Sequence, residues 1–373
     1  MDALMLPLNW QRVRLGDIGK PCMCKRVMKH QTTRYGEIPF YKIGTFGNTA
    51  DAFISKKLFL EYKTKYSFPK KGDILISASG TIGRAVIYDG KPAYFQDSNI
   101  VWIDNDETLV KNDFLFYAYS NVKWNTEHTT ILRLYNGNFR NTLIPLPPLN
   151  EQSAIANILS GLDRYLYALD ALILKKEGVK KALSFELLSQ RKRLRGFNQA
   201  WQRVRLGDVA NYLTSNLSVE QITQQGKIKV YDVNNFIGYT DTTFISDKPY
   251  ISIVKDGSVG RVRILPPKTN ILSTMGALIA NHRTTTEFLF YLLSNFDFKN
   301  FTSGSIIPHI YFKDYKEKTI FLPPLNEQSA IANILSALDN EIISLKNKKR
   351  QFENIKKALN HDLMSAKIRV LEK

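Results

Sequence analysis

The chain has few cysteines, few histidines and too few acidic residues to balance its basic ones. Its 373 residues include 2 cysteines and 5 histidines, with 34 Asp and Glu against 52 Lys and Arg. Cys22 and Cys24 are too close together for an ordinary structural disulfide, and the histidines lack metal-ligand spacing. These shortages argue against a disulfide-stabilised secreted protein and against a metal site, so we expect reduced thiols and a cytoplasmic location.

Other absences narrow the class further. No apolar run approaches the roughly 18 residues that a membrane span needs, and the opening MDALMLPLNW lacks a basic signal-peptide start. No phosphate-binding Gly-Lys-Ser/Thr motif is present, and both Pro-Pro-Leu segments lack the Asn/Asp-Pro-Pro-aromatic form of an amino-methyltransferase. A clustered acidic and lysine set of a metal-dependent nuclease is also missing. The sequence therefore predicts binding without catalysis and without a cofactor of its own.

An excess of positive charge is the strongest compositional feature. The formal net charge is +18, and 44% of the residues are hydrophobic, which is enough for folded cores. A protein this basic usually meets a polyanion, most often nucleic acid, although a solvated basic surface is the simpler alternative.

Two internal repeats show that the chain is a tandem duplication. The fifteen residues LPPLNEQSAIANILS, Leu146 to Ser160, recur unchanged from Leu322 to Ser336, and WQRVRLGD at Trp10 to Asp17 returns at Trp201 to Asp208. The interiors between these borders differ by 15 residues in length and far more in sequence. One scaffold with two different recognition surfaces is the simplest interpretation.

Both interiors predict mixed strands and helices, because short β-branched and aromatic runs alternate with turn residues. Each also has a Gly-Ser/Thr-aliphatic-Gly-Arg turn between two of its strands. We expect strands at residues 38–44, 73–79, 84–88 and 99–103 and a helix at 113–122, then strands at 228–233, 250–254 and 261–265 and a helix at 287–295. The predicted fold class is α+β.

A long helix follows each Pro-Pro-Leu segment, with Asn150 or Asn326 as the predicted N-cap and Gly196 as a cap for the end of the first helix. Apolar residues then recur at heptad spacing, broken at lysines in matching frames, which predicts an antiparallel helix pair of roughly 60 Å and a pseudo-two-fold internal repeat. The expected core of this coiled coil is Ile155, Leu159, Leu162, Leu166, Leu169, Ile173, Ile331, Leu335, Leu338, Ile342, Leu345 and Phe352.

These patterns divide the chain into four expected segments. Residues 1–149 and 197–325 form two globular recognition domains, and residues 150–196 and 326–373 form the helical spacers.

The glycine turns are the first candidate DNA contacts. Their glycines would let the backbone approach a phosphate, while the hydroxyls and arginines would bind it; a plain hairpin turn capped by its arginine is equally compatible. These candidates are Gly80, Thr81, Gly83 and Arg84 in the first copy, and Gly257, Ser258, Gly260 and Arg261 in the second.

Basic and polar loops supply the other candidates, with a solvated surface as the alternative for any single residue. The first interior contributes Lys25, Arg26, Lys29, His30, Arg34 and Tyr35, and the second contributes His282, Arg283, Ser303, Gly304, Ser305 and His309.

The paired WQRVRLGD segments, the Gly-Asp-Ile-Leu strand at Gly72 to Leu75, the glycine turns and the duplicated Leu-Pro-Pro-Leu-Asn-Glu-Gln resemble the specificity subunit of type I restriction-modification systems across the whole chain. The resemblance implies a non-catalytic DNA-binding subunit whose two domains each read half of a bipartite asymmetric double-stranded target. It implies as partners two copies of an adenine methyltransferase subunit that binds S-adenosylmethionine, and a restriction translocase-nuclease. Docking would involve Glu151, Gln152, Glu327 and Gln328.

Two alternatives stay open: a specificity subunit of a methylation-only complex, and a structural coiled-coil protein with basic domains. If the helices act as a ruler, four residues inserted after Leu172 should lengthen the DNA spacer by about one base pair.

Overall fold

The computed structural model describes residues 7–128 and 132–370, and the chain divides into two units. Unit 1 comprises residues 1–169 and 348–373, and unit 2 comprises residues 170–347. The helices α5 (Leu149–Leu188) and α8 (Leu325–Met364) each contribute one segment to each unit. Each unit therefore contains a pair of helix segments and a globular part, which we call the first globular part (residues 7–148) and the second globular part (residues 189–324). Residues 1–6, 129–131 and 371–373 of the expected segments lie outside the described residues.

Each globular part is built on a four-stranded antiparallel sheet, and the two sheets have equivalent strand orders. The predicted strand pairs on either side of the glycine turns form hairpins in both sheets. The first sheet contains, in order, β2 (Gly19–Met23), β8 (Ile100–Asn105), β5 (Ile74–Ser77) and β6 (Ala85–Ile87). The second contains β13 (Ala210–Thr214), β19 (Met275–Ala280), β16 (Tyr250–Val254) and β17 (Val262–Leu265).

A three-stranded mixed sheet accompanies each main sheet. In both, the middle strand pairs antiparallel with one neighbour and parallel with the other. The first consists of β4 (Phe53–Ile54), β3 (Ile38–Tyr41) and β7 (Tyr94–Phe95), and the second of β15 (Phe236–Thr240), β14 (Ile228–Tyr231) and β18 (Thr269–Ile271).

The two repeated border segments meet in space within each unit. Strand β1 (Gln11–Arg14), from the first WQRVRLGD segment, pairs antiparallel with β11 (Leu143–Leu146), which runs into Pro-Pro. Strands β12 (Gln202–Arg205) and β20 (Thr319–Leu322) repeat this pairing. The two borders are alike because each pair closes one globular part at the start of a long helix.

The helices of the globular parts pack on the sheets through apolar residues. The expected helices are α3 (Asn112–Tyr119) and α6 (Thr286–Ser294), and buried Phe114 and Phe288 join the two main cores. The short helices α4 (Asn136–Asn141) and α7 (Phe312–Tyr315) precede β11 and β20. Helix α2 (Lys56–Lys65) is capped at its N-terminus by Ser55, whose side chain accepts a hydrogen bond from the Leu58 amide. This helix has no counterpart in the described second globular part and accounts for much of the length difference.

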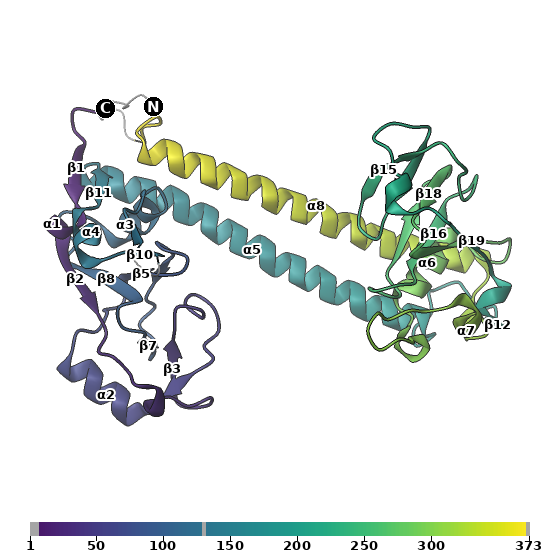
Figure 1. Cartoon of the computed structure of the whole chain (residues 1–373), viewed down its shortest axis with the longest axis horizontal. Helices are drawn as coiled ribbons and strands as arrows, with labels where there is room; N and C mark the ends of the chain where they lie inside the picture. The colour runs from purple at the N-terminus through teal and green to yellow at the C-terminus, as the bar shows by residue number, and fades with distance from the viewer. Residues whose placement is uncertain (1–6, 129–131, 371–373) are drawn as a thin grey trace. The chain divides into compact units, whose positions relative to one another are not determined.

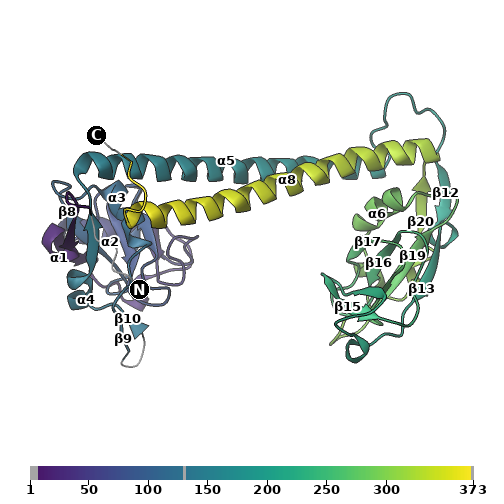
Figure 2. The same ribbon diagram turned by 90° about the horizontal axis from the view of Figure 1, so that it is seen from above.

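The helix segments run antiparallel within each unit (Figures 1 and 2). In unit 1, the rings of Tyr165 and Phe352 lie 4.7 Å apart and Asp163 binds Lys356. In unit 2, Lys176 binds Glu341 at 2.8 Å and Lys180 binds Asp339. Three of the lysines that interrupt the apolar pattern, Lys176, Lys180 and Lys356, therefore make ion pairs between the helices. Lys349 pairs with Glu353 of its own helix.

Burial along the heptad positions falls into three groups. The residues nearest the helix starts enter the globular cores, the central ones are buried between the helices, and the rest are half-buried. The first group is Ile155, Leu159, Ile331 and Leu335; the second is Leu169, Ile173 and Ile342; the third is Leu162, Leu166, Leu338, Leu345 and Phe352.

The predicted helix caps are wrong. Both helices begin one residue before the asparagines, and the carbonyl of Pro148 accepts the first helical hydrogen bond from the Gln152 amide at 2.9 Å. Helix α5 ends at Leu188 rather than near Gly196. Gln190 takes a left-handed conformation with φ of 61°, and the Lys192 amide reaches back to the Glu186 carbonyl, which completes a helix end of the usual left-handed type.

No helix in the described part of the chain is both long enough and apolar enough to cross a membrane.

Candidate DNA interface

The glycine turns are tight hairpin ends whose second glycine contacts an aromatic ring. Gly83 has a φ of +81°, and a Cβ there would lie 2.0 Å from Nε1 of Trp124. Gly260 has the same φ, and a Cβ would lie 2.6 Å from Cδ2 of Phe298. Packing and backbone conformation thus explain both glycines without a phosphate.

The first glycines and the hydroxyls of these turns remain at the surface. Gly80 and Gly257 also have positive φ, and a Cβ on Gly257 would meet nothing within 4 Å. Thr81 and Ser258 are exposed. The turn can therefore present a hydroxyl and backbone to a ligand while its second glycine stabilises the fold.

The two turn arginines are exposed and line separate cavities. Arg84 lies at a cavity of about 560 Å³ in unit 1 with Tyr117, Lys356 and Lys357. Arg261 lies at one of about 450 Å³ in unit 2, beside Phe298 and Lys299. Each cavity places a guanidinium and at least one ammonium group around one space together with a carboxylate, Glu353 in the first and Asp297 in the second, so neither is lined by cations alone.

Burial and a hydrogen bond to Asp163 raise the pKa of Tyr117 in the first of these cavities. Tyr291 donates equivalently to Asp339 in unit 2, and its pKa is raised for the same two reasons. Both phenols therefore donate to a carboxylate of a long helix and hold it in place.

A basic cavity in the first globular part collects residues from several loops. Its volume is about 450 Å³, and Arg26, Lys29, Lys42 and Arg133 line it together with a single acidic side chain, Asp97. Amide and hydroxyl groups of Gln96, Ser98 and Asn99 complete the polar wall. Such a mixture of cations and hydrogen-bonding groups suits nucleic acid, whose phosphates need charge and whose base edges need directional partners.

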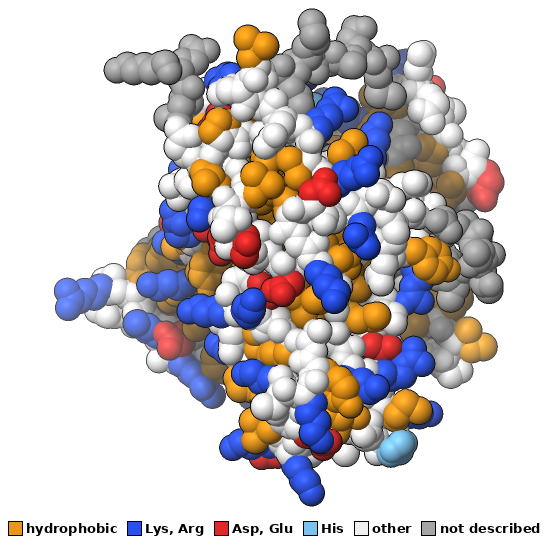
Figure 3. Space-filling view, turned by 90° about the vertical axis from the view of Figure 1, so that its left-hand side faces the viewer, with side chains coloured by type: hydrophobic (Ala, Val, Ile, Leu, Met, Phe, Trp, Pro, Cys, Tyr) orange, Lys and Arg blue, Asp and Glu red, His pale blue; other side chains and the backbone are white. Residues whose placement is uncertain are grey.

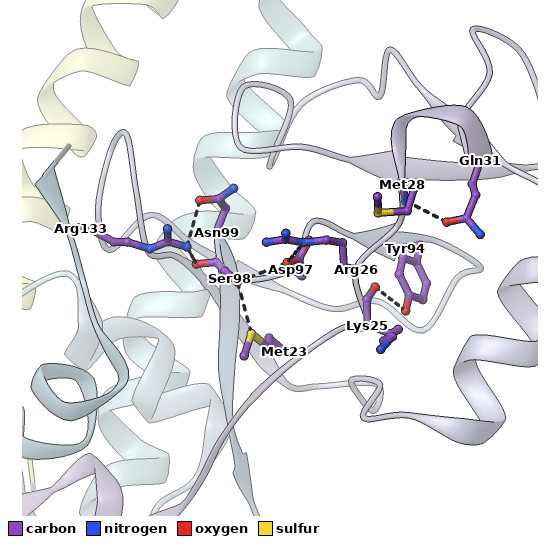
Figure 4. Close-up of polar contacts among 10 residues, drawn as sticks. All are labelled: Met23, Lys25, Arg26, Met28, Gln31, Tyr94, Asp97, Ser98, Asn99 and Arg133. Carbon is purple, nitrogen blue, oxygen red and sulfur yellow. Dashed lines mark hydrogen bonds and ion pairs between the residues drawn. The ribbon is translucent and has the colours of Figure 1, made fainter. Parts of the chain in front are cut away.

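Two arginines meet the turn at residues 97–99 from different segments (Figure 4). Arg26 Nε donates to Asp97 Oδ2 at 2.9 Å, and Arg133 Nη2 donates to the Ser98 carbonyl at 2.6 Å. Asn99 Oδ1 accepts from Ser79 Oγ at 2.8 Å and lies 3.5 Å from Arg133 Nη2. These bonds hold both guanidinium groups against the cavity wall.

The predicted basic loop is only partly gathered into this cavity. Arg26 and Lys29 line it, but the other members do not. Lys25 Nζ lies 5.0 Å from the centre of the Tyr66 ring, whereas Arg34 and Tyr35 are exposed, with 87% of Tyr35 accessible. Sequence reasoning missed Arg133, Lys42 and the 96–99 turn, which lie far apart in the chain.

Basic side chains outnumber acidic ones across the face in Figure 3.

In the second globular part, His282 and Arg283 are not brought to the glycine turn. They follow the end of β19, whereas the turn follows Val254, which pairs with Met275 at the start of β19. The Arg283 carbonyl instead accepts from Gln328 Nε2 at 3.0 Å. The structure thus separates this pair from the other candidates by the length of the sheet.

Ser305 and His309 belong to a loop that touches the glycine turn. Ser303 and His309 exchange backbone hydrogen bonds of 2.8 Å, and His309 also bridges to Asp256. The His309 ring lies 4.0 Å from the Asp256 carboxylate through Nδ1. Ser305 is exposed at the tip of this loop, together with Ile306 and Ile307.

The four residues expected to dock a partner are buried and bonded within the chain. Gln152 Nε2 donates to the Leu109 and Pro147 carbonyls, and Gln328 Nε2 to those of Arg283 and Pro323. Glu151 and Glu327 each accept from a tryptophan Nε1 and an arginine. Their exposed fractions are 2% or less, so they offer no surface to a partner, and the docking assignment is corrected to a structural one.

Among residues 7–128 and 132–370, no group of three or more His, Cys, Asp or Glu side chains could hold a metal ion.

Two copies of one α+β fold, each closed by the same pair of border strands at the start of a long helix, define a tandem-domain protein whose first copy has a basic cavity suited to nucleic acid. A family model described as the type I restriction modification DNA specificity domain matches residues 7–176 and again residues 198–354. The chain belongs to this family.

Known proteins agree with this assignment. A type I restriction enzyme specificity subunit of Haemophilus influenzae is 63% identical over 148 residues, which cover 39% of this chain and 38% of the relative. The type I restriction enzyme MjaVIII specificity subunit of Methanocaldococcus jannaschii is 26% identical, with 99% of this chain and 95% of the relative aligned. The crystal structure of the type I restriction-modification S subunit from M. genitalium shares the fold, with a TM-score of 0.65, 20% identity, and coverage of 96% and 98% of the two chains.

Proposed function

We propose that the chain is the DNA-reading subunit of a type I restriction-modification complex and catalyses no reaction itself. Each globular part reads one half of a bipartite, asymmetric duplex target. The helix pair sets the spacing of the half-sites and docks two copies of an adenine methyltransferase subunit, to which a restriction translocase-nuclease can be added. The methyltransferase supplies the S-adenosylmethionine.

The observation that carries this proposal is the duplicated scaffold with unlike surfaces. Strand orders, glycine turns and helix junctions repeat, whereas the residues around the turns differ. At equivalent places the first copy has Arg133 beside Ser79, and the second has His309 beside Asp256. A repeated scaffold with different side chains at the same positions is what two different half-sites would require.

Exposed apolar residues at matching helix positions support two equivalent docking sites. Tyr167 is 79% exposed in unit 1, and Ile343, 176 positions later, is 56% exposed in unit 2. Val179 and Ile355 form a second such pair, with 45% and 49% exposure. Each unit therefore has one member of each pair, which suits two copies of the same partner.

Methylation-sensitive sequencing tests directly whether the chain determines which DNA sequence is methylated. Genomes of strains with the chain and without it are compared, both carrying the cognate methyltransferase. The expected result is a bipartite adenine motif that is present only with the chain; identical methylomes would refute the proposal.

DNA titration separates this function from a purely structural coiled-coil role. With the methyltransferase bound, affinity for duplex DNA should fall steeply between 50 and 200 mM salt, by about 10³-fold if six phosphates are contacted. A structural role predicts no DNA binding, or binding that does not depend on salt.

A further inference from the structure

Arg133 and His309 occupy equivalent backbone positions in the two globular parts but have different side chains. Arg133 bridges to Ser79 and His309 bridges to Asp256, and both partners open a glycine turn. The following residues repeat the pattern, since the Leu134 amide donates to Ala78 at 2.8 Å and the Ile310 amide to Lys255 at 2.9 Å. The two positions are therefore structurally equivalent, 176 residues apart.

In the first globular part, this position opens onto the basic cavity. Arg133 is half-buried, and its Nη2 is held by the Ser98 carbonyl at 2.6 Å. A guanidinium carries five N–H donors in a fixed plane, so one anchoring nitrogen orients the others. A held guanidinium loses little conformational freedom on binding, which favours a directional contact over simple charge neutralisation.

The residues around Arg133 differ in what they can offer a ligand: some supply only positive charge, and others supply directional hydrogen bonds. Lys29 lines the same cavity and supplies positive charge that phosphate can use without regard to sequence. Lys42 also lines it but is paired with Asp51 at 2.8 Å. Arg26 is paired with Asp97, which reduces its free charge. Arg133 Nη2 is anchored to the uncharged Ser98 carbonyl and lies 3.5 Å from Asn99 Oδ1, so the full charge of the guanidinium and its Nε and Nη1 donors stay available to a ligand.

We propose that Arg133 is a specificity-determining residue that reads a guanine in the half-site of the first globular part, and that His309 occupies the matching reading position in the second. Guanine presents two acceptors, O6 and N7, in the major groove, and a guanidinium matches them with two parallel hydrogen bonds. The inference rests on the proposed function and assigns the base-reading role within it.

The test uses the full complex with its methyltransferase in cells, with motifs determined by methylation-sensitive sequencing. Arg133→Ala and Arg133→Lys should lose about 10- to 100-fold discrimination at one guanine of one half-site, because lysine keeps the charge but not the paired donors. His309→Ala should relax only the other half-site, which makes each variant the control for the other.

Binding of purified complexes completes the design. Arg133→Lys should keep affinity for non-specific duplex within about threefold, since that affinity depends on charge. If Arg133→Ala fails to fold because the 97–99 turn loses its hydrogen bond to Arg133, the test rests on the motif measured for Arg133→Lys alone. If the Arg133→Lys complex methylates the same motif as the wild type, the inference about Arg133 is overturned and the proposed function stands. If the wild-type complex itself methylates no specific motif, the proposed function is overturned as well.

Discussion

Arg369 binds Glu151, which lies 218 residues earlier in the chain, through two nearly parallel hydrogen bonds of 2.8 and 3.1 Å. Arg369 follows the end of α8, and Glu151 is in the first turn of α5. Arg193, which follows α5, binds Glu327 in the first turn of α8 in the same way, at 3.2 and 2.6 Å. In each unit, the end of one helix is therefore fastened to the start of the other, and Trp10 or Trp201 adds a third bond.

Arg193→Ala should destabilise unit 2 by about 3 kcal/mol, because it leaves the fully buried Glu327 carboxylate without its cation. Adding Glu327→Gln should restore part of the loss, since a neutral amide needs no counter-charge. Urea unfolding followed by tryptophan fluorescence measures both. Lys192→Ala is the control, as its amine is 3.9 Å from Glu186 and largely exposed, and we expect under 0.5 kcal/mol there. An equal effect of Arg193→Ala and Lys192→Ala would contradict the structural role of the junction.

Stability should fall at alkaline pH partly because of Cys24. Burial raises the pKa of this thiol from 9.0 to about 12. A raised pKa means that the contribution to stability is complete below pH 9 and is lost as the pH rises from 9 towards 12, by about 1.4 kcal/mol per pH unit. Cys24→Ala lacks this loss, so the difference in unfolding free energy between variant and wild type should shift in favour of the variant above pH 9. A difference that stays constant from pH 7 to 11 would show that the thiol is not shielded.

Lengthening both helices should change the DNA spacer. Four residues inserted after Leu172 and four after Lys348, the matching position in α8, add about 6 Å of helix. The preferred spacer should grow by one to about two base pairs, since about 6 Å corresponds to somewhat less than two base steps of about 3.4 Å. The motif from methylation-sensitive sequencing reports the spacer. Preserved half-sites with an unchanged spacer would rule out the ruler role.

Tyr167→Ser and Ile343→Ser should each remove one methyltransferase copy from the complex. The two residues occupy matching helix positions, one in each unit, so each variant weakens one site only. Native mass spectrometry should show one copy with either single variant and none with the double variant. Lys175→Ala, which changes an exposed charged residue of the same helix, is the control and should retain two copies. Two copies retained by the double variant would place docking elsewhere.

Local patterns predicted much of the fold because they depend on neighbouring residues. The strands around the glycine turns, helices α3 and α6, and the long helices appear close to their expected residues. The antiparallel helix pairing is confirmed, since Lys176 and Lys180 meet acidic residues of α8. Helix ends were harder, because Gln190 shows that a non-glycine residue can take the left-handed conformation when the chain is held on both sides.

The sequence by itself determined the duplication, the α+β class, the basic character and the family, because repeats, periodicity and charge are properties of the chain in order. Only the tertiary structure decided that Glu151, Gln152, Glu327 and Gln328 are buried and make hydrogen bonds within the chain, since their partners lie up to 218 residues away. It also brought Arg133 into the cavity with Arg26 and Lys29, through a pairing that no local pattern encodes. Burial and long-range contact depend on how the sheets close, and that closure is a property of the whole fold.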